Sequence, residues 1–497
     1  MAQEILINVG AAETRIAVVE NGKLEALSRE RTLGDDNQAA AGRSPVGDIV
    51  LGRVTKVLPA VQAAFVEIGH ERAGFLGARE ARCLGDASGD HEPAIGELVR
   101  EGDPVLVQVV KDPIGEKGAR LSASVTIPGR LCVLAPYQPG IALSRRIEDE
   151  TERARLQMLG EALIGEADGE LIAGAGYIFR TASIGAGAEE LHDDAVRLAQ
   201  DWRAVLDARR HAKPPALLHR DLDPVARALR DLVRGDTARI LIDDAEAGEA
   251  ARAFCRRAMP EVEPRIALFN GPGALFDDLE TDIDGLMLPR VPLQCGGWIM
   301  VEGTEALTAV DVNSGGFTHA SGLEDVSLTV NLEAARELGR QVRLRGIGGL
   351  IVVDFMHMKE EAHVERVLDA LTQSLSWDGA PVTVSRPSPL GLVEITRKRV
   401  REPLVARLSE SCAACAGQGK LRRPDAVAMD VLRRIETAAR AAPGKPIRVH
   451  AAPDVIHWID GQGERLRAAL ARRGAANLAF EQDTTCSREG FDVATLL

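Results

Sequence analysis

The sequence predicts a multidomain protein of mixed α+β and α/β class, and three observations lead to this prediction. The chain has 497 residues, enough for about three domains of ordinary size. Short β-rich runs follow one another closely between residues 47 and 125, a spacing typical of a small closed barrel such as the OB-fold. Beyond residue 297 two apolar strands flank a helical stretch, which is the pattern of an α/β domain.

The first elements are expected to be β-hairpins. β-rich runs occupy 5–9, 15–19 and 24–27, with Asn21 and Gly22 between the last two. Asn-Gly is a strong hairpin-turn signal because both residues tolerate a positive φ. A polar stretch at 34–44, rich in Gly, Ala and Asp, predicts a loop between domains.

The expected barrel carries two of the few aromatic residues of the chain. Its five strands are expected at 48–57, 63–69, 73–76, 105–111 and 119–122. Phe65 and Phe75 lie on two of these strands, and the basic residues near them are Arg53, Lys56, Lys111 and Lys117. Single-stranded nucleic-acid binders interleave aromatic rings and cations in this way. The alternative is that one or both rings fill the core of the barrel.

The next region mixes strands with charged helices. Helical stretches are expected at 147–160 and 189–210, followed by a strand at 238–243 and a helix that ends at 258. Arg180 and Thr181 close a strand-like run, and a guanidinium beside a hydroxyl can bind a terminal phosphate. The alternative is an ordinary solvated strand end.

Two carboxylates follow the apolar strands of the α/β region. Asp311 and Asp354 end the strands at 307–312 and 349–354, which flank a helix expected at 332–344, and Asn313 shares a face with Asp311. Converging carboxylates are ligands for Mg²⁺ or Mn²⁺, and such a metal serves phosphodiester hydrolysis. The alternative is that both aspartates only end strands or cap the next helix.

Cys412 and Cys415 form the C-x-x-C motif of the chain, which has seven cysteines and no second motif of this kind. The pair has the spacing of half a structural zinc site. It is also compatible with a redox pair, two unrelated thiols, or a zinc site completed by another copy of the chain. A redox motif should follow a strand and open a helix, whereas this one follows a basic helix expected at 397–408. A shared zinc predicts a symmetric pairing of protomers.

The net charge of −14 argues against a simple nucleic-acid coat, whose affinity depends on a cationic surface. Charge is unevenly distributed, however: the segment 385–423 has nine basic and three acidic residues, a local charge of +6. No secretory signal and no apolar run long enough for a membrane span are seen. We therefore expect a cytoplasmic protein without membrane partners.

In combination these stretches resemble the ribonuclease E/G family, and more closely its shorter G-type members. The matching stretches are 61–69, 108–113, 117–121, 177–181, 304–315, 331–335, 348–355, 391–397, Cys412 with Cys415, and 490–493. The resemblance implies two parts of an RNase H-like region, an inserted S1-like OB domain, a 5′-sensor domain, a DNase I-like catalytic domain, a zinc link and a small C-terminal domain. The two parts of the RNase H-like region would occupy 1–46 and 224–286, the OB domain 47–127 and the 5′-sensor domain 128–223. The catalytic domain would occupy 287–408, the zinc link 409–419 and the small C-terminal domain 420–497.

The resemblance also implies roles for individual residues. Asp311 and Asp354 would hold the catalytic Mg²⁺, and Asn313 would place the scissile phosphate. Cys412 and Cys415 would give half of a four-thiolate Zn²⁺ site shared between two protomers, in a dimer or a dimer of dimers.

RNA contacts follow from the resemblance in the same way. The residues implied are Phe65, Phe75 and Lys117 for the single strand, and Arg180, Thr181 and Val125 for a 5′-monophosphate. The implied function is Mg²⁺-dependent endonucleolytic hydrolysis of single-stranded A/U-rich RNA, leaving a 5′-phosphate and a 3′-hydroxyl, in rRNA processing and mRNA turnover.

The chain departs from the family pattern in three places. His357 stands where an acidic residue is usual, the stretch 286–295 is less basic and aromatic than is typical, and Ala416 replaces a polar residue. A non-cleaving RNA-binding protein of the same fold is the alternative function, and a DNA nuclease is a third hypothesis. The presence of Asp311, Asn313 and Asp354 together favours the enzyme, since a binding module has no need of all three.

Overall fold

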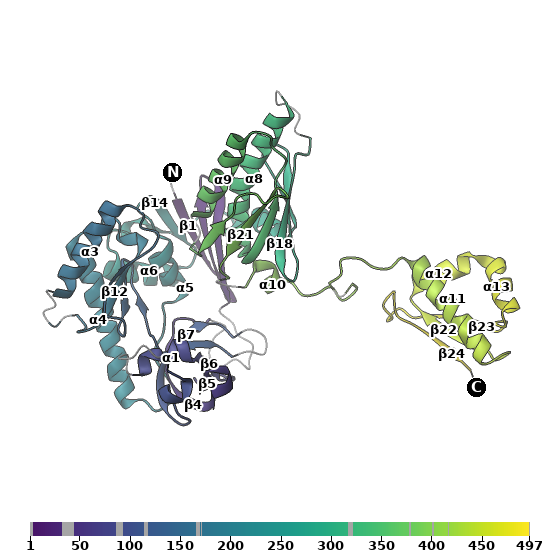
Figure 1. The fold of residues 1–497 in the computed structure, drawn as a ribbon, viewed down its shortest axis with the longest axis horizontal. Helices are drawn as coiled ribbons and strands as arrows, with labels where there is room; N and C mark the ends of the chain where they lie inside the picture. Colours follow the sequence, from purple (N-terminus) through teal and green to yellow (C-terminus); the bar gives the residue numbers. More distant parts are fainter. Residues whose placement is uncertain are drawn as a thin grey trace. The chain divides into compact units, whose positions relative to one another are not determined.

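The computed structural model describes residues 3–31, 44–85, 93–113, 118–165, 169, 171–316, 322–376, 379–399, 402–415 and 417–496. They belong to two compact units, Met1–Leu404 and Val405–Leu497, which are described separately (Figure 1). Lys117 and Ala416, both named above, lie outside the described residues.

The N-terminal strands join a later segment of the chain in one sheet. Its strands are β1 (Gln3–Val9), β2 (Glu13–Glu20), β3 (Lys23–Arg31), β14 (Thr237–Ile242) and β15 (Ile266–Leu268), in the order β15-β14-β1-β2-β3. Asn21 and Gly22 both have positive φ, 51° and 75°, which confirms the Asn-Gly hairpin turn. Helices α5 (Pro224–Leu232) and α6 (Ala245–Ala258) pack on the sheet through a shared apolar core, and Asp223 and Asp244 cap their N-termini.

The small barrel is closed and has five strands, as expected. They are β4 (Ile49–Leu58), β5 (Ala63–Glu67), β6 (Gly74–Gly77), β8 (Arg120–Ser122) and β7 (Pro104–Lys111), and β7 pairs back onto β4. Strand β13 (Ala216–His219) is added beside β4, and the short helices α1 (Ala78–Ala81) and α2 (Ile95–Leu98) pack beside the barrel.

The following region contains a four-stranded sheet and two long helices. The sheet has the order β11 (Gly140–Leu143), β12 (Gly176–Phe179), β10 (Cys132–Ala135) and β9 (Ile127–Pro128). Helices α3 (Glu150–Gly165) and α4 (Ala188–His211) confirm the two charged helical stretches. Tyr177, Phe179 and Trp202 are buried between the sheet and α4.

The two predicted carboxylate strands belong to a six-stranded sheet. Its order is β16 (Arg290–Pro292), β17 (Trp298–Gly303), β18 (Leu307–Asn313), β19 (Gly349–Asp354), β21 (Leu392–Arg397) and β20 (Val382–Val384), and α7 (Glu280–Gly285) precedes it. Helices α8 (Leu323–Arg345) and α9 (Glu361–Ser376) cover one face, where the apolar core lies (Figure 1). The opposite face we call the open face.

Helix α8 begins at Leu323, so the expected start at 332 is wrong. The first turns carry Glu324, Asp325 and Ser327 beside Leu328 and Val330, and this mixture hides the helical period in the sequence. Strands β18 and β19 are parallel, and α8 is the crossover between them.

The second unit is a small α/β fold. Strand β22 (Ile447–Ala451) pairs in parallel with β23 (Leu478–Gln482) and antiparallel with β24 (Phe491–Thr495). Its helices are α11 (Pro424–Ala441), α12 (Pro453–Gly461) and α13 (Gly463–Arg472). No helix within the described ranges of either unit is long and apolar enough to cross a membrane.

The basic helix expected at 397–408 is wrong. Strand β21 continues to Arg397, and only α10 (Leu404–Leu408) is helical. Val393, Ile395 and Arg397 are buried at alternate positions, which is the period of a strand and not of a helix. Pro403 disfavours helical backbone at the residue before it, so the helix begins only after this proline.

Candidate active site and RNA-binding surface

Asp311 and Asp354 lie side by side on the open face of the six-stranded sheet. The parallel register of β18 and β19 pairs these two residues directly, and neighbouring strands are about 4.8 Å apart. Both aspartates are exposed, while their neighbours Val310, Val312 and Val353 are buried on the helix-covered face. Two carboxylates from strands far apart in sequence therefore converge at one place.

Asn313 extends this pair on the same face. Its Nδ2 donates a hydrogen bond of 2.8 Å to Oδ2 of Asp311. Within the described part of the chain, no Lys or Arg forms an ion pair with Asp311 or Asp354. Among the residues that the structure describes, the two carboxylates thus have no cationic partner.

This donor set fits Mg²⁺ better than a metal that needs a cage of protein ligands. Among the described residues, no group of three or more His, Cys, Asp or Glu side chains could hold a metal ion. Mg²⁺ usually keeps several waters and is bound through one or two carboxylates. Asp311 and Asp354 can supply such a pair of oxygen ligands.

Helix α8 holds the loops on both sides of the carboxylate pair. Asn331, fully buried, donates to the backbone oxygen of Met356 at 2.7 Å and accepts from its backbone N–H at 3.0 Å. This fixes the loop that follows Asp354. The carboxylate of Glu333 accepts the backbone N–H groups of Gln294 and Cys295 in the turn between β16 and β17.

A third anchor on α8 is Glu324, at its first turn. Its carboxylate accepts the backbone N–H groups of Lys359 and Glu360 and contacts His363. Hydrogen bonding from the Lys359 backbone, helped by His363, lowers the pKa of Glu324. Sequence reasoning missed Asn331, Glu333 and Glu324, although a polar side chain such as Asn331 within an apolar helix face is a readable signal.

His357, one of the departures from the family pattern, is exposed in the loop after β19. It makes no hydrogen bond or ion pair with any other described residue. The residue therefore lies near the carboxylate pair in sequence but is not part of its hydrogen-bonded support.

The barrel carries its aromatic residues in a row across neighbouring strands. The strand registers pair Lys56 with Phe65, Phe65 with Phe75, Phe75 with Arg120, and Arg120 with Lys111. Directly paired residues share a face of the sheet. We call these five residues the barrel row.

Both rings of the barrel row are half-buried and lie outside the barrel core. Their centroids are 6.2 Å apart, with an edge-to-face angle of 77°. The alternative that Phe65 or Phe75 fills the core is therefore excluded. Arg120, which sequence reasoning missed, pairs with Glu80 at 2.7 Å, whereas Lys56 and Lys111 form no ion pair with another described residue.

The candidate phosphate sensor is already engaged with protein groups. Arg180 donates to the backbone oxygen of Gly129 at 2.6 Å and to Asp231 at 2.7 Å. Burial raises the pKa of Asp231, but hydrogen bonds and charges from Arg230 and Arg180 outweigh it and the pKa is lowered. A phosphate bound by Arg180 would thus compete with a carboxylate that stays ionised.

The other two residues of the expected sensor differ in exposure. Thr181 is half-buried and begins a single 3₁₀ turn directly after Arg180. Val125 is only 1% exposed and packs in the core of this region. Their roles at a 5′-phosphate stay predictions.

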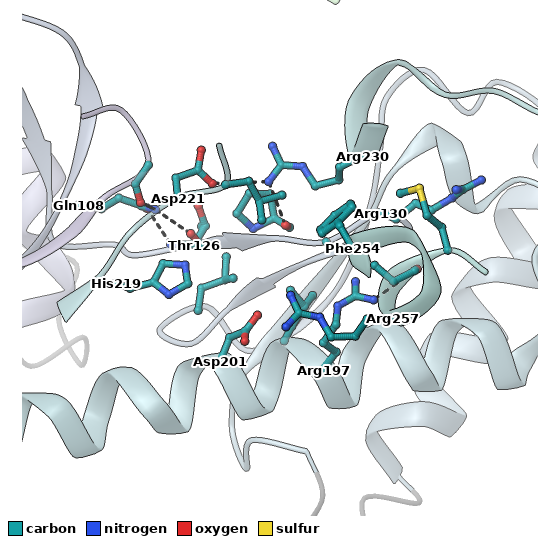
Figure 2. A pocket seen from close by; sticks show the side chains of 18 residues that line it. Gln108, Thr126, Arg130, Arg197, Asp201, His219, Asp221, Arg230, Phe254 and Arg257 are labelled. Atoms are coloured by element: carbon teal, nitrogen blue, oxygen red, sulfur yellow. Dashed lines mark hydrogen bonds and ion pairs between the residues drawn. The ribbon is translucent and has the colours of Figure 1, made fainter. Parts of the chain in front are cut away.

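A small cavity of about 50 Å³ lies next to this region, between the barrel and α4, α5 and α6 (Figure 2). Arg130, Arg197, Arg230, Arg257 and His219 line it together with Asp201 and Asp221. Arg230 is ion-paired with Asp231, which also binds Arg180. Asp231 therefore connects Arg230, which lines the cavity, with Arg180 of the candidate sensor. Arg180 and Thr181 themselves do not line the cavity.

Cys412 and Cys415 lie in a turn of the second unit. Cys412 is exposed, Cys415 is half-buried, and Gly419 donates its backbone N–H to Sγ of Cys415 at 3.3 Å. Hydrogen bonds from the backbone of Cys415 and Ala414 lower the pKa of Cys412. The motif neither follows a strand nor opens a helix, so the arrangement expected of a redox motif is absent from this described stretch.

The local charge of the segment 385–423 is compensated in part by residues outside it. Arg386 pairs with Glu365, Arg422 with Asp430 and Arg423 with Asp425. Arg397 is buried and donates to a backbone oxygen. A count within a sequence window misses these acidic partners, so the net charge of +6 does not describe a free cationic surface.

Two regions of the chain match models of known protein families. Residues 126–400 match the model of the ribonuclease E/G family, and 411–495 match that of the RNase E/G thioredoxin-like domain. Ribonuclease G of Escherichia coli (strain K12) is 35% identical over 507 aligned residues, covering 100% of both chains. Ribonuclease G of Haemophilus influenzae is 37% identical over 504, again covering 100% of both.

Ribonuclease E of Haemophilus influenzae is 36% identical over 501 aligned residues, covering 99% of this chain and 52% of that protein. The chain therefore belongs to the ribonuclease E/G family. The resemblance seen in the sequence is confirmed. The closed five-stranded barrel agrees with it, while the names and roles of the other sub-domains stay predictions.

Proposed function

We propose that the chain is a Mg²⁺-dependent endoribonuclease that cleaves single-stranded A/U-rich RNA. The observation that carries this proposal is the direct pairing of Asp311 with Asp354 on the open face, next to Asn313. The chain shares its full length with proteins named ribonuclease G. The barrel row supplies a second surface suited to single-stranded RNA.

The reaction is hydrolysis of a phosphodiester. Asp311 and Asp354 would hold the ion, which when bound neutralises charge on the phosphate and makes a water more acidic. Asn313 donates one amide N–H to Asp311, and its second N–H is left to orient a phosphate oxygen. The oxygen of water would bond to phosphorus while the bond from phosphorus to the 3′-oxygen breaks, and one proton of that water would end on the 3′-oxygen, which leaves a 5′-phosphate and a 3′-hydroxyl.

Substrate choice would come from two surfaces away from the carboxylates. Phe65 and Phe75 offer rings on which bases can stack, and Lys117 would add a cation. Arg180, Thr181 and Val125 would favour RNA with a 5′-monophosphate, as expected for an enzyme of rRNA processing and mRNA turnover.

A shared Zn²⁺ would link two copies of the chain. Cys412 and Cys415 supply two of the four thiolates that a tetrahedral zinc site needs. The lowered pKa of Cys412 favours the thiolate that binds zinc. The predicted assembly is a dimer or a dimer of dimers. The double variant Cys412→Ser with Cys415→Ser should lose bound zinc and show a lower mass in light scattering, and an unchanged mass and zinc content would refute the link.

The decisive experiment is a cleavage assay with a 5′-monophosphorylated A/U-rich oligonucleotide. Internal cleavage should require Mg²⁺ and should vanish in Asp311→Asn. A matched 5′-hydroxyl RNA tests the sensor, and a DNA oligonucleotide of the same sequence tests the substrate class. Tight binding without any cleavage by the wild type would favour the non-cleaving RNA-binding protein instead.

A further inference from the structure

We infer that Arg290 and Trp298 form a phosphate-binding subsite on the open face, which holds the RNA phosphate next to the scissile one. The inference deepens the proposed function and rests on it. Arg290 would contact the phosphate directly, and Trp298 would hold the guanidinium in place.

The strand registers place Arg290 in line with the candidate metal ligands. Arg290 pairs with Met300 between β16 and β17, Met300 pairs with Asp311, and Asp311 pairs with Asp354. All four side chains therefore lie on the open face. Two strand spacings, about 10 Å, separate the backbones of Arg290 and Asp311, a gap that a long side chain and one nucleotide can bridge together.

Trp298 ties Arg290 to the end of β18, where Asn313 lies. The guanidinium of Arg290 lies 4.1 Å from the centroid of the indole ring, within the range of a cation–π contact. Trp298 is itself paired with Asn313 in the sheet. A Cβ added to Gly315 would lie 2.9 Å from the Cζ3 atom of Trp298, so the ring packs closely against the backbone at Gly315. The indole is thus fixed between the arginine and the loop after β18.

The hydrogen-bond donors of Arg290 are not used by any residue that the structure describes. Arg290 is exposed and makes no hydrogen bond or ion pair with any other described residue. Other exposed arginines of the same unit, such as Arg239 and Arg256, are paired with glutamates. A planar guanidinium that is fixed by stacking and whose donors no described residue uses is ready for an anion that accepts two hydrogen bonds, such as phosphate.

The position of Arg290 also explains how a weakly basic segment can serve RNA. Arg290 is the single basic residue between 286 and 295. The fold brings this one cation to the open face in the same row as the carboxylates. Asp311 and Asp354 repel RNA in the absence of a metal, so a nearby cation is needed to hold the strand on this face.

The first test measures RNA binding without cleavage, in full-length protein that carries Asp311→Asn. Adding Arg290→Ala should weaken the binding of a single-stranded RNA about 10-fold and lower the slope of log affinity against log salt by ~0.7, the value for one phosphate contact on a single strand. Arg386→Ala is the matched control, because Arg386 pairs with Glu365 of α9 on the helix-covered side. The control should change neither quantity.

Position is tested with an RNA that has one neutral methylphosphonate linkage beside the cleavage site. This linkage should weaken binding to the parent but not weaken it further in the Arg290→Ala variant, since the two changes remove the same contact. Trp298→Ala should act like Arg290→Ala, and Trp298→Phe should retain most of the affinity. Arg290→Lys keeps the charge and should fall between parent and Arg290→Ala.

The outcomes separate this inference from the proposed function. If the wild type cleaves RNA and Arg290→Ala leaves the salt slope and the methylphosphonate effect unchanged, the subsite is refuted while the endoribonuclease stands. A lower thermal midpoint with an unchanged slope would assign Arg290 and Trp298 to stability of strand β16 alone, which also refutes the subsite. If the wild type does not cleave RNA, the proposed function fails, whatever the slope.

Discussion

The barrel row and the open face of the six-stranded sheet are both formed by pairing across neighbouring strands, but they differ in charge. In both, side chains that are distant in sequence meet because they are paired across neighbouring strands. The barrel row has rings flanked by Lys56, Lys111 and Arg120, and of these three cations Arg120 is ion-paired with Glu80. The open face has two carboxylates at its centre. We therefore expect the barrel row to bind RNA without a metal ion, and the open face to bind RNA only when a cation offsets its two carboxylates.

The strongest test of this difference is Asp311→Asn. We expect RNA cleavage to fall by at least about 100-fold, because a metal ligand supplies several kcal/mol of transition-state stabilisation. RNA binding should be retained, or improve slightly at low Mg²⁺, since a negative charge is removed. Cleavage rates and fluorescence anisotropy on one preparation measure both effects. Equal cleavage by wild type and variant would show that the open face is not the site of reaction.

Removal of the rings tests the barrel row. The double variant Phe65→Ala with Phe75→Ala should weaken binding of single-stranded RNA by about 5- to 150-fold, because base stacking contributes roughly 1–3 kcal/mol per base. The loss should appear in KM more than in kcat, and Phe65→Trp should preserve the affinity. Unchanged binding in the alanine variant would show that the barrel row does not touch RNA.

The sequence predicted those features that depend on residues close together in the chain, and it did not predict those that depend on contacts with distant segments. The Asn-Gly turn, the closed barrel and the ends of β18 and β19 follow from short-range patterns, so these predictions held. The start of α8 and the end of β21 depend on burial supplied by other segments. Asn331 could not be assigned, because its partner is the backbone of Met356, which comes near only after the sheet is formed.

Asn331 tests whether the open face needs support that the barrel row does not. Asn331→Ala removes both hydrogen bonds to Met356 and leaves its partly buried backbone groups unpaired, which costs up to about 1–3 kcal/mol of unfolding free energy. Cleavage should fall roughly 10-fold by analogy with residues that orient metal ligands. Urea denaturation and kcat measure the two effects, and binding through the barrel row should not change. A loss of stability with normal kcat would limit Asn331 to folding.

The smallest expected effect concerns Arg180, whose charge is compensated by Asp231, whereas Lys56 and Lys111 have no such partner among the described residues. Asp231→Asn should increase the preference for 5′-monophosphorylated over 5′-hydroxyl RNA by a few-fold, since an ion pair of this exposure contributes up to about 1 kcal/mol. Because the pKa of Asp231 is lowered, the carboxylate stays ionised as the pH falls from about 7 to about 5. The wild type should therefore show no rise in this preference over that range. A rise in the preference on acidification, or a preference that survives Arg180→Ala, would mean that the 5′ end is recognised elsewhere. The next residues to mutate would then be Arg130, Arg197 and Arg257, which line the cavity.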